Sequence, residues 1–200
     1  MFTGIVHNQY PISHITDAPG LRSFSVAFPP ELLEGLEIGA SVSVSGVCLT
    51  VTKVEGSDVF FDAMQETLQK TTLGALKEGD KVNIQRSFRA MDEIGGHMVS
   101  GHVDTMADIA ETKQNGGDVT AVFRVEPRWM EYILPKGFIA LDGCSLTVVE
   151  TGPDWFTIAF IPETLRRTTF GTKKAGDKVN VEIDRQTQAI VETVKRYLQK

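Results

Sequence analysis

Long apolar runs, an excess of positive charge and paired cysteines are all missing from this sequence. No apolar stretch approaches the roughly 20 residues that span a bilayer, and residues 1–9 lack the basic start and apolar core of a secretory signal peptide. A membrane protein and an exported protein are therefore not expected, and the cytoplasm is the expected compartment. Lys and Arg number 20 and Asp and Glu 26, a formal net charge of −6, so no nucleic-acid partner is expected.

The cysteine count and the missing nucleotide-binding and hydrolase motifs exclude several further classes of protein. Cys48 and Cys144 are far apart and form no Cys-x-x-Cys motif, so neither a disulfide framework nor a structural zinc site is supported. A Gly-x-Gly-x-x-Gly loop, a P-loop and a Gly-x-Ser-x-Gly motif are also absent. Dinucleotide-dependent enzymes, nucleotide hydrolases and α/β-hydrolases are therefore not indicated. Hydrophobic residues make up 42% of the chain, which is enough for a packed core.

What the sequence does contain is one segment written twice. Gly46 corresponds to Gly143, 97 positions later, and the same register relates further matches without a gap: 49–51 with 146–148, 66–68 with 163–165 and 79–83 with 176–180. So many matches in one register exclude coincidental turn chemistry. We assign residues 1–97 to the first domain, with the linker 88–97 at its end, residues 98–186 to the second, and residues 187–200 to a C-terminal tail.

Each copy has the pattern of an all-β domain. Residues 41–44 alternate polar and apolar side chains, and 48–54 and 59–61 are rich in β-forming residues on either side of a Gly-Ser-Asp turn. Another strand is expected at 81–84. Helical signals are brief: residues 30–34 begin with proline, and 127–131 are their counterpart. Several short strands with regular turns predict a small closed antiparallel barrel in each copy.

The tail differs from both copies, because its apolar residues have helical spacing. Ile190, Val191, Val194, Tyr197 and Leu198 fall on one face of a helix. A helix this short is marginal in isolation, so it must pack on its own barrel or on copies of itself. The sequence leaves both possibilities open.

Two pairs of small polar residues are the first candidate for chemistry. Cys48 and Thr50 are two residues apart on an expected strand, so their side chains project from the same face, and Ser145 and Thr147 do the same in the second copy. These groups could line two equivalent pockets. The alternative is that they face solvent or bind local backbone groups.

The Glu-Thr-Leu segments are the second candidate. Residues 64–68 and 161–165 follow expected strands and precede Thr-Thr-x-Gly turns. Exposed amides and hydroxyls there would suit the polar edge of a heterocycle. Capping of a helix by the threonine is the alternative interpretation.

The differences between the copies point to an asymmetric reaction, in which one ligand is the donor and the other the acceptor. Four of the divergent positions are informative: Cys48 against Ser145, Ile5 against His102, Ser41 against Phe138 and Ser87 against Asp184. A histidine titrates near neutral pH, so His102 is a candidate proton shuttle, and a structural role is its alternative. A metal site on His97 and His102 is disfavoured because a strand would turn them to opposite faces.

These motifs resemble those of the riboflavin synthase family, of the α-chain type, over residues 1–188. The segments that carry the resemblance are 1–6, 46–51, 95–97, 100–103, 136–137, 142–148 and 161–165. The resemblance implies two tandem six-stranded antiparallel Greek-key barrels and a C-terminal helix that holds a homotrimer together. It implies an enzyme that converts two molecules of 6,7-dimethyl-8-ribityllumazine into riboflavin and 5-amino-6-ribitylamino-uracil, without cofactor or metal. The active site would lie between the N-terminal barrel of one subunit and the C-terminal barrel of a neighbour, and association with lumazine synthase is a further implied possibility.

The resemblance also implies which residues act. Cys48, His102, Ser145 and Asp184 are the expected catalytic residues, with Lys136 as a further charged partner. The expected substrate contacts from the first copy are Phe2, Gly4, Ile5, Val6, Ser41, Cys48, Leu49, Thr50, Asp62, Ala63, Met64, Gln65, Glu66 and Thr67. Those from the second are Gly101, His102, Val103, Lys136, Ser145, Leu146, Thr147, Ile161, Pro162, Glu163, Thr164, Leu165 and Arg166.

Two other functions remain to be weighed against the enzyme. Lumazine-binding antenna proteins share the fold, bind one chromophore without turnover, and tend to have a degraded motif in the second copy. Here residues 100–102, 145–147 and 161–165 are intact, which favours the enzyme. A flavin-binding barrel within an oxidoreductase is the weakest alternative, because the chain has no nicotinamide-binding module.

Overall fold

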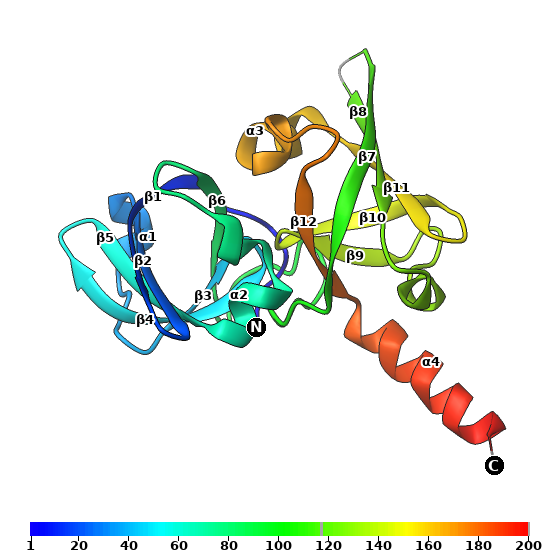
Figure 1. Cartoon of the computed structure of the whole chain (residues 1–200), viewed down its shortest axis with the longest axis horizontal. Helices are drawn as coiled ribbons and strands as arrows, with labels where there is room; N and C mark the ends of the chain where they lie inside the picture. The colour runs from blue at the N-terminus through cyan, green and yellow to red at the C-terminus, as the bar shows by residue number, and fades with distance from the viewer. Residues whose placement is uncertain (117, 200) are drawn as a thin grey trace.

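The two copies fold into two closed antiparallel β-barrels that lie side by side, and a C-terminal helix projects away from both (Figure 1). We describe a computed structural model, which places residues 1–116 and 118–199. The first barrel has the strand order β1-β2-β5-β4-β3-β6, and the second repeats it as β7-β8-β11-β10-β9-β12. The prediction of two six-stranded barrels and one C-terminal helix is confirmed.

The twelve strands of the described residues have nearly equivalent bounds in the two copies. The first barrel contains β1 (Asn8–Ala18), β2 (Leu21–Ala27), β3 (Ser41–Val44), β4 (Val47–Glu55), β5 (Asp58–Met64) and β6 (Lys81–Arg86). The second contains β7 (Thr105–Asn115), β8 (Asp118–Arg124), β9 (Phe138–Leu141), β10 (Cys144–Thr151), β11 (Trp155–Phe160) and β12 (Lys178–Ile183). The predicted strands at 41–44, 48–54, 59–61 and 81–84 are therefore present, three of them longer than predicted.

Short helices lie between the strands, and one longer helix follows the last strand. The α-helices are α1 (Pro30–Leu33), α2 (Gln65–Lys70), α3 (Pro162–Arg167) and α4 (Arg185–Leu198), and the 3₁₀ helices are η1 (Thr72–Ala75), η2 (Pro127–Tyr132) and η3 (Thr169–Gly171). The predicted helix at 30–34 is α1, whereas its counterpart at 127–131 is 3₁₀. A single proline-initiated turn of this length is common in either form.

Two tight turns bring the copies into contact. The turn between β3 and β4 has positive φ at Ser45 (45°) and Gly46 (83°), and the turn between β9 and β10 repeats this at Asp142 (44°) and Gly143 (79°). Positive φ at both central residues is typical of the hairpin turn that matches strand twist. The two glycines face each other, since a Cβ added to Gly46 would lie 2.6 Å from the amide nitrogen of Gly143.

Reciprocal hydrogen bonds hold the two barrels in a pseudo-twofold arrangement. The amide of Asn83 donates to Asp142 O (3.0 Å), and its copy Asn180 donates to Ser45 O (2.7 Å), the residue equivalent to Asp142. The backbone segments that precede each barrel also pair, because Phe2 and Val99 each donate an N–H to the other's carbonyl (2.8 and 2.9 Å). Every one of these contacts has its counterpart 97 positions away, so the duplication in sequence is also a symmetry in space.

The apolar residues form one core inside each barrel and a small cluster between the barrels. The cluster consists of Phe2, Val99 and Ala140, with Cys48 packed against it. Phe2 has no exposed surface. Phe2 and Val99, in the backbone segments that precede each barrel, are therefore buried as well as hydrogen-bonded to each other.

Helix α4 begins at Arg185, two residues before the predicted start of the tail at 187, because Asp184 caps it. The Asp184 carboxylate accepts hydrogen bonds from the N–H groups of Gln186 (3.4 Å) and Thr187 (2.9 Å), as N-cap residues do. The helix has no buried residue, and Tyr197 and Leu198 are 77% and 76% exposed. Val191 is half-buried and packs against the core of the second barrel, so the start of the helix lies on its own barrel, whereas Ile190, Val194, Tyr197 and Leu198 of the predicted apolar face are exposed.

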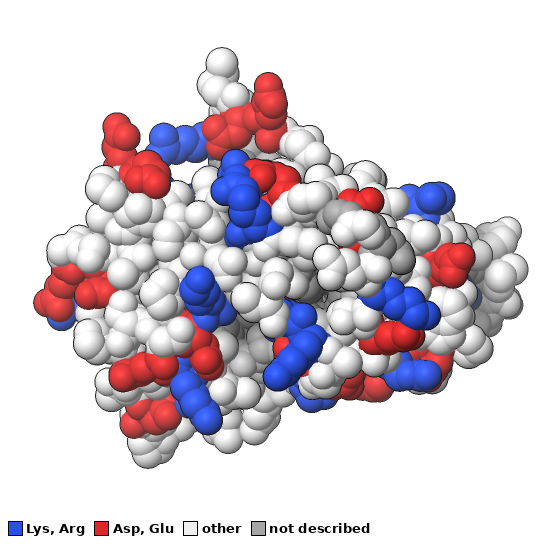
Figure 2. Space-filling view, turned by 90° about the horizontal axis from the view of Figure 1, so that it is seen from above, with Lys and Arg blue, Asp and Glu red and all other residues white. Residues whose placement is uncertain are grey.

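Charges of both signs are interspersed on the surface. The face seen in Figure 2 has blue and red groups side by side and no stripe of one sign. In the described ranges, 1–116 and 118–199, no helix is long and apolar enough to cross a membrane.

We expect the contact between Gly46 and Gly143 to be essential for stability. In Gly46→Ala the positive φ costs about 1 kcal/mol, and the clash with the facing turn adds about 1–3 kcal/mol. Gly56→Ala is the matched control, because Gly56 also has positive φ (59°) but a Cβ there would meet nothing within 4 Å. Urea unfolding should show a larger loss for Gly46→Ala, and equal losses would contradict the proposed packing.

Candidate functional site

The two predicted pairs of small polar residues lie on the outer faces of two equivalent strands. They are Cys48 with Thr50 and Ser145 with Thr147. On β4, Cys48 is half-buried and Thr50 exposed, while Leu49 between them points into the core. On β10, Ser145 and Thr147 have the same alternation around Leu146. The prediction that the two residues of each pair project from the same face of their strand is therefore confirmed, as the two-residue period of a strand requires.

Ser145 is bonded to a histidine that lies just before the second copy. His97 Nδ1 is 2.6 Å from Ser145 Oγ, and the imidazole is 7% exposed. Its ring stacks on Phe138, with a centroid separation of 5.1 Å and an interplanar angle of 14°. Gly96 permits this approach, because a Cβ there would lie 2.7 Å from the Cβ of Ser145 and 2.3 Å from Thr3 O.

Burial and charge set the protonation of this pair. Burial lowers the pKa of His97 below its ordinary value of 6.5, and the carboxylate of Asp184 opposes that shift. Burial would raise the pKa of Asp184, but hydrogen bonds from Thr187 and Gln186 outweigh it and leave the pKa below its usual value. A neutral imidazole beside a hydroxyl, with an ionised carboxylate nearby, can accept a proton at neutral pH.

The first copy supplies one wall of the Ser145 site. Ser145 N–H donates to Gly4 O (2.8 Å), and Gly4 has φ of +74° with no room for a Cβ, which would lie 2.5 Å from that of Ser145. Between these elements lies a cavity of about 400 Å³, lined by Gly4, Ile5, Val6, Cys144, Ser145, Glu163, Thr164, Arg167 and Thr168. Predicted contacts from both copies therefore meet in one cavity.

The site of the first copy is closed in the same way by the second. Cys48 N–H donates to Gly101 O (2.8 Å), which is the counterpart of the Ser145–Gly4 bond. Gly101 has φ of +81°, and a Cβ there would lie 2.6 Å from that of Cys48. His102 follows directly and is exposed. Cys48 and Ser145 thus each contact the segment that leads into the other barrel, whereas Thr50 and Thr147 are exposed.

The Glu-Thr-Leu segments form the short helices α2 and α3 beside these sites. Hydrogen bonds from Arg166 and Arg167 lower the pKa of Glu163 to about 2, and Lys70 lowers that of Glu66 in the first copy. The capping alternative applies to the next threonines: Thr71 and Thr168 accept backbone N–H groups of η1 and η3 through their hydroxyls. Thr67 and Thr164 are half-buried and are not the caps.

The remaining predicted contacts fall into three groups. Five are buried, so that only their backbone or one edge can reach a ligand: Phe2, Val6, Leu49, Ala63 and Leu146. Ser41 is half-buried and pairs with Thr50 in the ladder between β3 and β4, and Val103 and Leu165 are also half-buried. The exposed ones are Ile5, Asp62, Met64, Gln65, Lys136, Ile161, Pro162 and Arg166.

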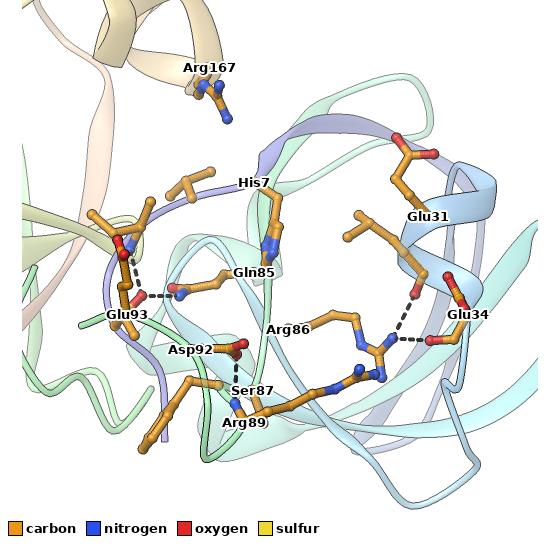
Figure 3. A pocket seen from close by; sticks show the side chains of 15 residues that line it. His7, Glu31, Glu34, Gln85, Arg86, Ser87, Arg89, Asp92, Glu93 and Arg167 are labelled. Atoms are coloured by element: carbon orange, nitrogen blue, oxygen red, sulfur yellow. Dashed lines mark hydrogen bonds between the residues drawn. The ribbon is translucent and has the colours of Figure 1, made fainter. Parts of the chain in front are cut away.

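A second cavity, of about 530 Å³, adjoins the first at Ile5, Val6 and Arg167 but has different chemistry (Figure 3). Charged side chains of both signs surround it, among them Glu31, Glu34, Arg89, Asp92 and Glu93. Its lining includes none of the residues Cys48, Thr50, Ser145 and Thr147. The cavity of about 400 Å³ is therefore the candidate site, because Ser145 lines it, although its volume is the smaller of the two.

His97 and His102 have different surroundings in the structure. His97 is buried against Ser145, whereas His102 is exposed on the other site's wall. Among residues 1–116 and 118–199, no cluster of three His, Cys, Asp or Glu side chains has the arrangement of a metal site.

Comparison with known proteins identifies the family. Residues 3–87 and 100–184 each match the lumazine binding domain family. The riboflavin synthase of Escherichia coli (strain K12) is 50% identical over 199 residues, which cover 99% of this chain and 93% of that protein. The chain belongs to the riboflavin synthase family. The riboflavin synthase of Chlamydia pneumoniae is 42% identical over 198 residues, 99% of this chain and 97% of the relative. The curated relatives are enzymes by name.

Solved structures of the family's fold carry ligands. The structure of LumP complexed with riboflavin has a TM-score of 0.86 and 27% identity, and covers 92% of this chain and 100% of that chain. The structure of LumP complexed with 6,7-dimethyl-8-(1'-D-ribityl) lumazine has a TM-score of 0.82 and 26% identity, over 91% and 98% of the two chains. The family's intact motifs in both copies set this chain beside the riboflavin synthases, and the antenna-type interpretation is not favoured.

His97 lies in segment 95–97, which carries the family resemblance, but the sequence analysis assigned it no role beside Ser145. Its position has no counterpart in the first copy, since Met98 already corresponds to Met1. A search for divergence between copies therefore could not find it. The signal that was available is the pair of glycines before it, because Gly95 and Gly96 allow a side chain to approach closely.

We expect nuclear magnetic resonance to find the pKa of His97 below 6.5. Asp184→Asn should lower it further, since removing a negative charge destabilises the imidazolium. His102→Gln is the assignment control, because it removes one set of imidazole signals and should leave the titration of His97 unchanged. A higher pKa in Asp184→Asn would show that the carboxylate does not act on His97.

Proposed function

We propose that this chain catalyses the riboflavin synthase reaction, in which two molecules of 6,7-dimethyl-8-ribityllumazine react with each other. One gives a four-carbon unit to the other, and the products are riboflavin and 5-amino-6-ribitylamino-uracil. Together the products contain all the atoms of the two substrates, so the reaction needs no oxidant or reductant. The observation that carries the proposal is the pair of equivalent walls, Cys48–Thr50 and Ser145–Thr147, in a chain of this family.

Holding two flat heterocycles with their reacting carbons adjacent is the main catalytic task. Backbone groups at the exposed ends of β4, β10, α2 and α3 would bind the polar edges, and the exposed apolar side chains of Met64 and Ile161 would contact the rings. Lumazine binding is the property that both matched domains share with their family.

Proton transfer is assigned to the second copy. The reaction requires that the C7 methyl group of one lumazine lose a proton. Ser145 would accept it while passing its own hydroxyl proton to His97 Nδ1, 2.6 Å away, and Asp184 would stabilise the imidazolium that results. His102 and Cys48 would serve the other substrate in the first-copy site. A positioned acid–base group typically contributes 10²–10⁴-fold to the rate.

The family resemblance implies that the two walls of one chain belong to different active sites. The buried cluster of Phe2, Val99 and Ala140 packs against Cys48, and Cys48 and Ser145 each bond to the segment that leads into the other barrel. In the proposed enzyme, each active site combines a first-copy wall and a second-copy wall from different subunits. The exposed apolar face of α4 supports a homotrimer joined through these helices.

Two further assignments complete the proposal. Cys48 and Cys144 are free thiols, which accords with a reducing cytoplasm. The family resemblance extends the list of partners to lumazine synthase, and co-elution of the two purified proteins would test that association.

The purified chain, mixed with 6,7-dimethyl-8-ribityllumazine and no added metal or nucleotide, should form riboflavin at half the rate at which lumazine disappears. Absorbance and fluorescence would follow both compounds. Ser145→Ala should lower kcat by about 10²-fold or more, because it removes the proton relay. Ser57→Ala, in the turn between β4 and β5, is the matched control. Tight binding of lumazine without turnover would overturn the proposed function.

Assembly through α4 predicts a concentration-dependent activity. Ile190→Asp places a charge on the exposed apolar face, so light scattering should find smaller species, and activity should fall as the protein is diluted. Ala189→Asp introduces the same charge on the adjoining, polar side of the helix and should leave both unchanged. A fully active monomer would contradict a site shared between subunits.

A further inference from the structure

Arg185, the first residue of helix α4, binds the segment that carries His102. Its Nη1 donates to Asp104 Oδ1 (2.9 Å) and to Gln188 Oε1 (2.7 Å), and its Nη2 donates to the backbone carbonyl of His102. One guanidinium therefore joins α4 to the segment before β7 that contacts the first-copy site. Asp104 is itself held in place, because its Oδ2 accepts the N–H of Ile183 (2.9 Å) at the end of β12.

A buried carboxylate fixes the other side of the same segment. Glu182 is 2% exposed and accepts hydrogen bonds from Ser100 N–H (2.7 Å), Ser100 Oγ (2.7 Å) and Gly101 N–H (2.8 Å). Its carboxylate lies 4.0 Å from Nε of Arg185. Glu182 and Arg185 thus bind the residues on either side of the Gly101 carbonyl, which accepts the N–H of Cys48. Hydrogen bonds to charged groups such as these are shorter and stronger than neutral ones.

The first copy has neutral residues at the equivalent positions and an open cavity in place of the guanidinium. Gln85 stands for Glu182, His7 for Asp104 and Phe88 for Arg185, each 97 positions earlier. These three residues line the cavity of about 530 Å³ (Figure 3). Only the second copy has the charged network, so the network is not required for building a barrel of this type.

We propose that Arg185 is a positioning residue that holds His102 in the first-copy substrate site and ties that site to helix α4. The inference rests on the proposed function, in which His102 faces one substrate and α4 joins the subunits. Through Arg185, the element that assembles the subunits also fixes the wall against which the substrate lies.

The shape of the guanidinium makes the role specific to arginine. Its planar fork reaches Asp104, Gln188 and the His102 carbonyl at once, whereas a lysine ammonium is a single point on a flexible stem. Lysine at this position would keep the charge and lose at least one of the three contacts. The His102 carbonyl would then have no partner from α4, and the backbone that carries the imidazole would be less firmly held.

The test compares Arg185→Met and Arg185→Lys with Arg124→Met. Arg124 is the matched control, because it forms an exposed ion pair with Asp154 in the same barrel and carries no predicted role in the site. We expect kcat to fall about 10–100-fold in both Arg185 variants, as a displacement of about 1 Å can cost, with KM changed less than kcat. Lysine should fail to restore activity, and Arg124→Met should match the wild type.

A spectroscopic readout separates positioning from a general loss of structure. On addition of riboflavin, the imidazole signals of His102 should shift in the wild type and in Arg124→Met, and should shift little in the Arg185 variants, which keep the wild-type response of His97. If Arg185→Met lowered the thermal midpoint or dissociated the subunits while His102 still responded normally, the proposal would be wrong. Wild-type kcat in Arg185→Met would also overturn it.

A second variant keeps the proposal testable if Arg185→Met does not fold. Asp104→Asn preserves the shape of the side chain but removes the charge that Arg185 binds, and it should reduce kcat and the His102 response in the same direction. An unchanged response in a folded Asp104→Asn protein would contradict the network. Riboflavin binding does not need turnover, so the proposed positioning role and the proposed reaction can fail independently.

Discussion

The reciprocal backbone contact between the copies is the constraint on which the rest of the structure depends. Ser145 binds Gly4 and Cys48 binds Gly101 through equivalent hydrogen bonds of 2.8 Å. Because each contact joins a pocket wall of one barrel to the leading segment of the other, neither site is complete within its own copy. The facing glycines of the two turns permit the close approach that this exchange requires. The positions of the walls, of the histidines and of the buried cluster all follow from it.

A symmetric framework carries asymmetric chemistry. The backbone contacts repeat almost without change, whereas the side chains that bear on reactivity differ. The buried His97 and the half-buried Ser145 form a hydrogen-bonded pair in one site, and Cys48 with the exposed His102 occupies the other. Conserved backbone geometry would present two identical ligands in equivalent ways. Different side chains would then treat one ligand as donor and the other as acceptor, which is what a reaction between identical molecules demands.

The two barrels and the paired walls were predictable from the sequence, because a repeat shows each strand and turn pattern twice. The register of 97 residues predicted the two domains, and the two-residue spacing of Cys48 and Thr50 and of Ser145 and Thr147 predicted that each pair shares one face of its strand. The start of α4 was misplaced by two residues, since Asp184 acts as a cap and as a divergent site residue at once. His97 was missed because its position precedes the second copy and has no partner for comparison. The exchange of leading segments was also beyond prediction, because it depends on contacts between residues far apart in sequence, such as Gly4 and Ser145.

The location of residues 2–6 has a consequence for how the protein is made. These residues leave the ribosome long before Val99 and Ser145, the partners that hold them. The first barrel can close its six strands while this segment still lacks its final neighbours. Completion of the second pocket must then await the synthesis of Ser145, so during vectorial synthesis residues 2–6 reach their native contacts later than the barrel that follows them.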